Sequence, residues 1–346
     1  MLPINLEFAP MEATLVDEVP RSAGAWQYEP KWDGFRCLAF RDGKDIAMRS
    51  KSGQPLDRYF PEVVAALGQS SGGKFVIDGE LVINEGDHFS FDDLLERIHP
   101  AASRIKKLSI ERPATFIVFD LLVDDAGNNL TQLPLEERRK HLKVFFEKHL
   151  KGLDKIVLSP CSTDFEVAEK WWKLVGEGLD GLVAKRLGIP YQTGNRKGMV
   201  KIKKLRSADC VIGGFRYATN SRVVGSLLLG LYDEEGKLHH VGFTSAFKAN
   251  EKRELTKTVE PLIQPPGFTG NAPGAPSRWS TERSADWHPL RTKLVVEVQY
   301  DHFTGGRFRH GTKILRWRPD KLPEQCTFEQ VRRPIKGTAN LFRTVS

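Results

Sequence analysis

The pattern of hydrophobic and polar positions changes near residue 205. Before that point, β-rich runs alternate with amphipathic stretches. The runs at 35–40, 75–83, 115–122 and 181–186 are bounded by Gly, Asp or Asn and predict strands. Apolar residues recur at helical spacing in 134–150 and 163–175, which predicts two helices, the second capped by Thr163 or Asp164. The first part is therefore expected to be a mixed α and β domain.

After about residue 206, shorter β-rich runs dominate. They lie at 210–215, 226–232, 239–245, 293–300 and 313–319, and one charged helical stretch lies near 247–262. Several short strands with a single helix are typical of a small Greek-key barrel of the OB type. The Pro- and Gly-rich run 264–277 predicts an exposed loop. The expected organisation is α+β, with one domain over 1–205 and an OB-fold β-barrel over 206–346.

Length and composition fit this two-domain interpretation. The chain has 346 residues, of which 40% are hydrophobic, enough to bury a core in each domain. No apolar run approaches the roughly 18 residues that span a bilayer, and the first twenty residues do not resemble a signal peptide. The four cysteines stand singly at no metal-ligand or redox spacing, which fits a reducing compartment. We expect a cytoplasmic protein without a zinc site.

Charge is distributed unevenly between the two predicted domains. Residues 1–205 hold 30 basic and 30 acidic residues, whereas residues 206–346 hold 22 basic and 14 acidic residues, which accounts for the whole net charge of +8. A basic second domain indicates either a polyanionic partner such as nucleic acid or simply a solvated basic surface. Charge does not decide between these two interpretations.

The strongest candidate for chemistry is Lys31, in the run Glu29-Pro30-Lys31-Trp32-Asp33-Gly34-Phe35-Arg36. A lysine amine is a nucleophile only when it is unprotonated, so a catalytic role requires burial or nearby positive charge to lower its pKa. Gly34 permits close backbone approach, and Arg36 is placed to hold a phosphate or a ribose. Taken alone, the run is explained more readily as an ordinary charged strand end.

Ionic residues interrupt four other β-rich segments. Asp78-Gly79-Glu80 and Phe119-Asp120 lie inside strongly apolar strands, Asp180 and Lys185 flank another strand, and Lys201 and Lys203 alternate along a fourth. Buried charges are costly unless they are paired or bind a ligand. Four such interruptions in one domain argue against four unrelated edge charges, and together they indicate a nucleotide pocket.

In this order and spacing, the segments resemble the motifs of the covalent nucleotidyltransferase superfamily, which contains ATP-dependent DNA ligases and mRNA capping enzymes. The resemblance runs from Glu29 to Lys321 and is closest to small bacterial ligases of the ligase C type. It implies a nucleotidyltransferase domain with an ATP-grasp-like adenylation fold, followed by the OB domain. It also implies sealing of nicked duplex DNA in repair, through AMP carried on Lys31.

The resemblance assigns roles to the matching positions. Lys31 is the nucleophile, and Glu80 and Asp180 hold Mg²⁺, for which Mn²⁺ can substitute. The other matching residues are assigned to ATP: Glu29 to the adenine amino group, Phe119 to stacking on adenine, Arg36 and Glu80 to the ribose, Lys51 to the ribose or DNA, Lys185, Lys201 and Lys203 to the α-phosphate, Arg196 to phosphate, and Arg318 and Lys321 to pyrophosphate.

The sequence departs from the family pattern at several positions. Asp180 stands where Glu is usual, and Lys51 stands where Arg is frequent. The interval from Arg196 to Lys201 is one residue short, and Met199 and Val200 replace the usual Trp. The alternatives are an RNA ligase or a capping guanylyltransferase and, in another class, a nucleic-acid-binding module without catalysis. We expect a monomer that associates with the nucleoid, with no membrane attachment and with DNA contact provided by the two domains.

Overall fold

The computed structural model describes residues 1–22, 24–85, 88–175, 179–274 and 286–332. The described residues divide into two compact units, one over Met1–Lys204 and one from Leu205 onward, and each unit is described separately. In the described part of the chain, no helix is long and apolar enough to cross a membrane.

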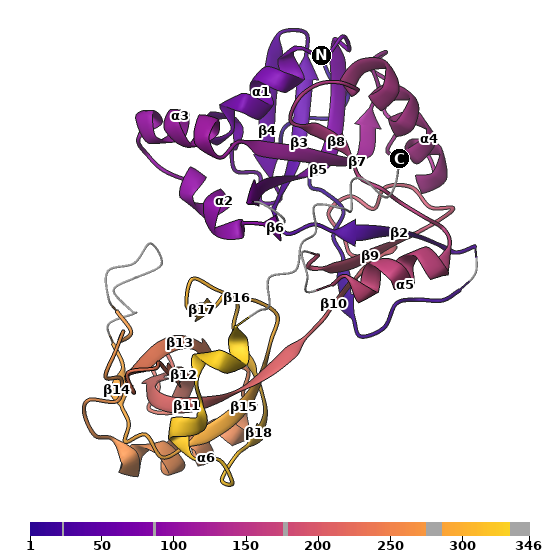
Figure 1. The fold of residues 1–346 in the computed structure, drawn as a ribbon. Helices are drawn as coiled ribbons and strands as arrows, with labels where there is room; N and C mark the ends of the chain where they lie inside the picture. Colours follow the sequence, from indigo (N-terminus) through magenta and orange to yellow (C-terminus); the bar gives the residue numbers. More distant parts are fainter. Residues whose placement is uncertain (23, 86–87, 176–178, 275–285, 333–346) are drawn as a thin grey trace. The chain divides into compact units, whose positions relative to one another are not determined.

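The first unit contains two β-sheets (Figure 1). The larger sheet has the order β4 (Asp45–Ser50), β3 (Phe35–Asp42), β5 (Lys74–Glu85), β7 (Ala114–Val123) and β8 (Ile156–Leu158), and the short β6 (His88–Phe89) pairs with β5. The smaller sheet has the order β1 (Thr14–Val16), β10 (Met199–Lys203), β9 (Gly181–Arg186) and β2 (Trp26–Lys31). The predicted strands are confirmed, although β5 and β7 extend beyond their predicted limits.

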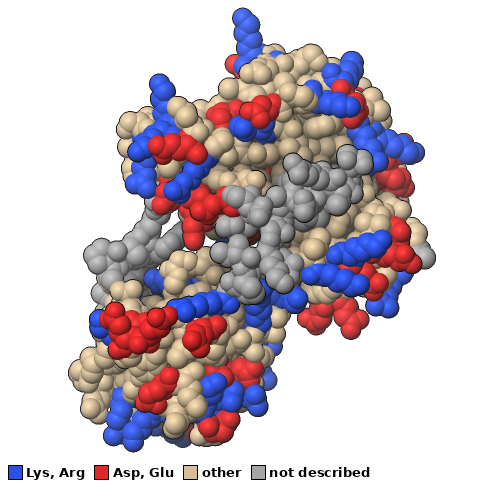
Figure 2. Space-filling view, in the orientation of Figure 1, with Lys and Arg blue, Asp and Glu red and all other residues tan. Residues whose placement is uncertain are grey.

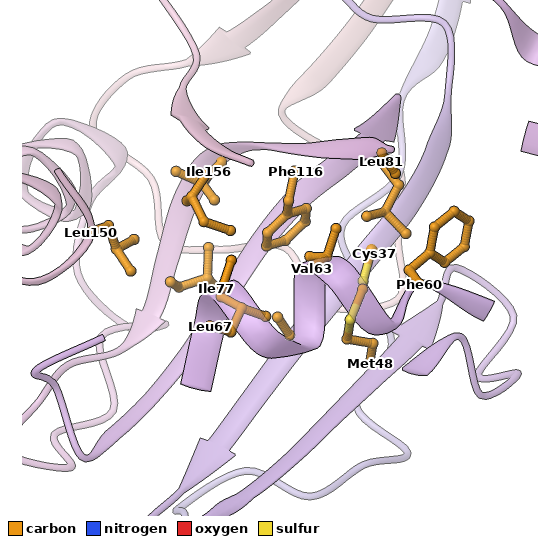
Figure 3. Packing of buried hydrophobic residues seen from close by; sticks show 14 of the residues in the cluster. Cys37, Met48, Phe60, Val63, Leu67, Ile77, Leu81, Phe116, Leu150 and Ile156 are labelled. Atoms are coloured by element: carbon orange, nitrogen blue, oxygen red, sulfur yellow. The ribbon is translucent and has the colours of Figure 1, made fainter. Parts of the chain in front are cut away.

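The larger sheet is apolar on both faces, which explains its nearly continuous hydrophobic runs. Along β3, Cys37 and Ala39 face one core, whereas Leu38 and Phe40 face another. The first core is closed by α1 (Pro61–Gly68) and α4 (Leu135–Phe145), and Figure 3 shows Val63 and Leu67 of α1 beside Ile77 of β5. A third core joins the two sheets and α5 (Phe165–Lys173).

The remaining helices of this unit are α2 (Phe91–Arg97), α3 (Ala102–Glu111) and a 3-10 turn, η1 (Asp57–Tyr59). The helix expected over 134–150 is α4 followed by a π-helical turn, η2 (Phe146–Leu150). The second predicted helix is α5, and its cap is Asp164, whose side chain accepts a hydrogen bond from Glu166 N at 2.8 Å.

The second unit is built around an antiparallel sheet. Its order is β13 (Leu238–Thr244), β12 (Val224–Tyr232), β11 (Arg206–Tyr217), β15 (Val295–Tyr300) and β18 (Lys313–Trp317), and β14 (His288–Pro289) pairs with β11. An isolated bridge between Thr244 and Thr312 connects the end of β13 to the segment before β18. This arrangement fits a partly open OB-type barrel, because the continuous ladder itself stays open.

Shorter elements complete the second unit: α6 (Ala249–Val259), η3 (Glu260–Leu262), the hairpin of β16 (Phe303–Thr304) and β17 (Arg307–Phe308), η5 (Pro323–Gln325) and η6 (Phe328–Val331). The run 264–274 contains no helix or strand, as expected, but Phe268 is buried in the barrel core. The prediction of a wholly exposed loop is therefore wrong at that residue, and residues 275–277 lie outside the described part. On the face seen in Figure 2, acidic and basic side chains are interspersed in both units.

Candidate nucleotide site

Lys31 and Asp180 meet because β2 and β9 run antiparallel. Lys31 pairs with Gly181 in the ladder, and Asp180 N donates a hydrogen bond to Lys31 O at 3.1 Å. The Lys31 Nζ donates to Asp180 Oδ2, and Lys203 Nζ lies 3.5 Å from the same oxygen. The Asp180 side chain is only 2% exposed. One buried carboxylate therefore holds two of the predicted site lysines.

Gly34, Gly79 and Gly181, each of which follows an aspartate, permit close packing of strands. A Cβ on Gly34 would overlap Leu81 O, and one on Gly181 would overlap Ile202 O. At Gly79, a Cβ would lie 2.6 Å from Ile117 O, closer than van der Waals contact allows. Each glycine therefore leaves space for the backbone of a neighbouring strand. This close packing fixes the positions of the ionic residues next to the glycines.

The pKa of Lys31 is raised, which corrects the expectation of a lowered value. Burial is the largest single influence and favours the neutral amine, but the negative charges of Asp180, Glu80 and Asp33 outweigh it. Sequence reasoning anticipated cationic neighbours for Lys31. It did not anticipate a direct contact with the acid at Asp180.

Glu29 lies on β2 and is almost completely buried. Its Oε1 accepts a hydrogen bond from Gln27 Nε2 at 2.7 Å, and its Oε2 lies 2.9 Å from Lys185 Nζ. The same lysine lies over the Phe119 ring, 4.4 Å from its centroid. The structure thus brings three predicted site residues into one buried group, in which Gln27 is an additional member.

Arg36 is fixed by Asp78, a residue to which the sequence assigned no specific role. Its Nε and Nη2 donate to Asp78 Oδ1 and Oδ2 at 2.5 and 2.6 Å, and its guanidinium lies 4.7 Å from the Phe119 ring centroid. Asp78 is fully buried and also accepts a hydrogen bond from Tyr191 Oη at 2.6 Å. Phe119 is 7% exposed and has two cations near its ring, so adenine stacking on it requires one of them to shift.

Glu80 lies opposite Arg36 in the β3–β5 ladder. Burial raises the pKa of Glu80 to about 7, against the lowering influence of Lys31 and Arg36. The pKa of Lys201 is lowered, first by burial and then by the positive charges of Lys203, Lys31 and Lys51. The charge of Lys31 therefore acts on both Glu80 and Lys201.

Lys51 and Arg196 lie at a more exposed position and share the carboxylate of Glu12. Glu12 Oε2 is 2.9 Å from Lys51 Nζ and 3.2 Å from Arg196 Nε. The hydrogen bond from Lys51 is the main reason that the pKa of Glu12 is lowered, and Arg196 adds to the effect. Glu12 lies in the segment before β1, and no sequence motif indicated its role.

Arg318 and Lys321 belong to the second unit, where both pair with Asp209. Arg318 Nη1 donates to Asp209 Oδ1 at 2.8 Å, and Lys321 Nζ lies 2.9 Å from Asp209 Oδ2. Arg318 also donates to Asp320, through Nε at 3.0 Å and Nη2 at 2.8 Å. We call Asp209, Arg318 and Lys321 the Asp209 clamp.

Sequence reasoning thus placed Lys185, Lys201 and Lys203 correctly in strands but missed three of the acids that hold site cations. Asp78 stood in an interrupted strand and gave a signal. Glu12 and Asp209 gave none, because they precede or begin β-rich segments in which a single acid is ordinary.

Comparison with known proteins agrees with the fold and identifies the family. Residues 10–203 match the family described as ATP dependent DNA ligase domain, and residues 220–321 match the ATP dependent DNA ligase C terminal region. The chain is 41% identical to "DNA ligase C" of Mycobacterium tuberculosis, over 96% of each chain. It is likewise 41% identical to "DNA ligase C1" of Mycolicibacterium smegmatis, over 96% of each chain.

A solved structure gives the same result. The structure described as mycobacterial DNA ligase D complexed with ATP and MES is 27% identical, covers 93% of this chain and 98% of its own, and superimposes with a TM-score of 0.51. The two family matches together account for both units of the chain. The chain therefore belongs to the ATP-dependent DNA ligases, of the small bacterial type.

Proposed function

We propose that this protein seals nicks in duplex DNA through AMP carried on Lys31. ATP first adenylates the lysine, AMP then passes to the 5′-phosphate at the nick, and the 3′-hydroxyl finally attacks that phosphate and releases AMP. The observation that supports the nucleophile is its environment: Lys31 ends β2 beside the buried Asp180, and Lys203 shares the same carboxylate. Positioning and charge neutralisation, which this environment provides, account for most of the catalysis of phosphoryl-type transfer.

The surrounding residues suit the parts of ATP. Glu29, held by Gln27 and Lys185, offers a carboxylate to the adenine amino group, and Phe119 offers a ring. Arg36 and Glu80 lie opposite each other on the adjacent strands β3 and β5 and are assigned to the ribose. The remaining cations of the first unit are assigned to phosphate or DNA: Lys51, Lys185, Arg196, Lys201 and Lys203.

A divalent cation fits the acidic residues near Lys31. Mg²⁺ prefers oxygen ligands and needs only one or two carboxylates beside substrate phosphates. Asp180 and Glu80 supply these oxygens, and the raised pKa of Glu80, caused by burial, shows a carboxylate that gains from further positive charge. When bound, Mg²⁺ supplies charge stabilisation to the phosphates. Mn²⁺ has similar ligand preferences and is expected to substitute.

In the first step, Lys31 gives up to solvent the proton that its raised pKa retains, and the neutral amine then forms a bond to the α-phosphorus as the bond from that phosphorus to the bridging oxygen breaks. Pyrophosphate leaves, and a second amine proton passes to solvent. Lys185, Lys201 and Lys203 neutralise charge that develops on the α-phosphate oxygens. Arg318 and Lys321 are assigned to the leaving pyrophosphate.

Intact-mass analysis after incubation with ATP and Mg²⁺ tests this function. We expect the mass of one AMP to be added, to disappear on addition of nicked duplex DNA, and to be absent in Lys31→Ala. A chain that takes label from GTP instead of ATP would support a capping enzyme, and a chain that seals nicked RNA but not nicked DNA would support an RNA ligase. Sealing by Lys31→Ala at the wild-type rate would exclude Lys31 as the carrier.

The proposed oligomeric state, biological process and location of the protein remain to be tested. We propose that the protein acts as a monomer in DNA repair and recombination, in the cytoplasm and in association with the nucleoid. Analytical ultracentrifugation with and without nicked DNA tests the monomer, since a stable dimer would sediment faster at every concentration.

A further inference from the structure

The Tyr191 hydroxyl connects three distant parts of the first unit. It donates to Asp78 Oδ2 at 2.6 Å and accepts from Met11 N at 2.9 Å. Asp78 lies on β5, Met11 lies in the segment before β1, and Tyr191 lies in the segment that leads to β10. Asp78 and Tyr191 stand in runs used to assign the site, Tyr191 at the start of Tyr191-x-x-Gly194-x-Arg196, but neither was given a role of its own.

The surroundings hold Tyr191 in one position. Its side chain is only 5% exposed, its ring packs against Phe8 at 5.9 Å, and the Arg138 guanidinium lies 5.4 Å from its centroid. Burial, followed by the negative charge of Asp78, raises the pKa of Tyr191 well above its usual value. The phenol therefore keeps its proton and acts as a hydrogen-bond donor to Asp78.

Asp78 uses both oxygens on Arg36, and Oδ2 is shared with Tyr191. A carboxylate held by two partners from different directions has little rotational freedom, so the guanidinium that it pairs with is fixed as well. The backbone of the same region strengthens the link, because Glu12 N donates to Asn195 O at 2.9 Å and Gly194 N donates to Ala9 O at 3.2 Å.

We propose that Tyr191 is a positioning residue for ATP binding, which acts by fixing the Asp78 carboxylate that orients Arg36. The proposal rests on the proposed function in one respect, namely that Arg36 contacts the nucleotide. It adds a residue whose hydroxyl touches neither ATP nor the reacting atoms. It also explains why the segments 8–12 and 191–196 are docked together beside Arg36.

The test is Tyr191→Phe in the full chain, which removes the hydroxyl and keeps the ring. Initial rates of Lys31 adenylation are measured over a range of ATP concentrations. We expect KM for ATP to rise about 10-fold with kcat changed less than about 2-fold, as for loss of binding that ground and transition states share. Combined with Arg36→Met, Tyr191→Phe should cause no further rise, because it acts through that guanidinium.

Tyr28→Phe is the matched control. Tyr28 is 2% exposed in the same unit, and its hydroxyl donates to Pro20 O at 2.7 Å, away from Arg36. We expect it to lower the melting temperature like Tyr191→Phe but to leave KM for ATP unchanged. If Tyr191→Phe is unfolded at the assay temperature, the rates are measured below its melting temperature, where the same rise in KM is expected.

The possible outcomes separate this proposal from the proposed function. A wild-type chain that gains no AMP on Lys31 overturns the function itself. A wild-type chain that is adenylated, with a Tyr191→Phe variant whose KM matches that of Tyr28→Phe, overturns only the role of Tyr191. A rise in KM that persists in full beside Arg36→Met overturns it equally, because the hydroxyl would then act by another route.

Discussion

Replacing Asp209 by Asn should slow the first step of ligation and spare the last. Asp209 holds Arg318 on one oxygen and Lys321 on the other, at 2.8 and 2.9 Å. The side chain amide of Gln330 supports the strand at this point, since Asp209 N donates to Gln330 Oε1 at 2.9 Å. The substitution keeps this backbone bond and the side-chain volume but removes the charge that fixes both cations.

The size of the effect follows from the burial of the three side chains. Asp209 is 10% exposed, Arg318 17% and Lys321 23%, so solvent screens the clamp less than an ordinary surface pair. Charge-assisted bonds contribute roughly 1.5–3 kcal/mol each, and the asparagine oxygen retains one neutral bond, so we expect a loss of about 2 kcal/mol in unfolding free energy. Misplacement of the two cations should slow Lys31 adenylation about 10-fold, which corresponds to about 1.4 kcal/mol.

Two reaction rates distinguish misplacement of Arg318 and Lys321 from a general loss of structure. Adenylation of Lys31 releases pyrophosphate, whereas sealing of a nick that already carries AMP does not. Glu297→Gln is the matched control, because Glu297 faces Asp209 across the β11–β15 ladder and pairs with Arg316 at 2.6 Å. We expect the control to adenylate normally. An Asp209→Asn variant that loses both rates equally, or neither, would refute the reasoning.

Two further predictions concern charge at the edge of the site and in the barrel core. Glu12→Gln should free Lys51 and Arg196 for phosphate, so the slope of log affinity for nicked DNA against log salt should steepen by about 1, measured by fluorescence anisotropy. Glu169→Gln, which removes a more exposed acid, should leave the slope unchanged, and equal slopes in both variants would contradict this account. Burial, followed by the charges of Arg307 and Arg216, lowers the pKa of His240 from 6.5 to about 3. The unfolded chain then binds more protons below pH 6.5, so stability falls with acidification, by about 2 kcal/mol from pH 7 to pH 5. Urea titrations should show that this increment is lost in His240→Gln, and an unchanged pH dependence would mean that the histidine is already protonated or solvated.

Local pattern predicted most of the fold. Runs such as 115–122 are too apolar for a half-exposed strand, and the structure buries β7 on both faces. Asp164 was identified as a possible cap by its position before a helical period. Phe268 was not predicted to be buried, because its flanking Pro and Gly residues indicate a loop, whereas Gly213 and Gly230 leave space for its ring in the barrel.

The sequence predicted the site residues that stand in recognisable motifs, but not the partners that come from other parts of the chain. Each cation of the site stood out in its own motif, but its counter-ion comes from far along the chain. Lys31 and Asp180 are separated by 149 residues, Arg318 and Asp209 by 109, and Arg196 and Glu12 by 184. Such pairs are set by which strands become neighbours, and a hydrophobic period does not specify that.

The burial of the acidic partner distinguishes fixed pairs from exchangeable ones. Asp78 is fully buried, so separating it from Arg36 would leave a charge without solvent, a cost of several kcal/mol. Glu12 is 27% exposed and its partners Lys51 and Arg196 are 56% and 67% exposed, so water can replace either member at little cost. On the proposed assignment of Lys51 and Arg196 to phosphate or DNA, we expect substrate phosphate to displace Glu12 from its two cations, whereas the nucleotide is expected to approach Arg36 with Asp78 still attached. We therefore expect the exposed group to support repeated binding and release of DNA, and the buried pair to hold one geometry throughout the cycle.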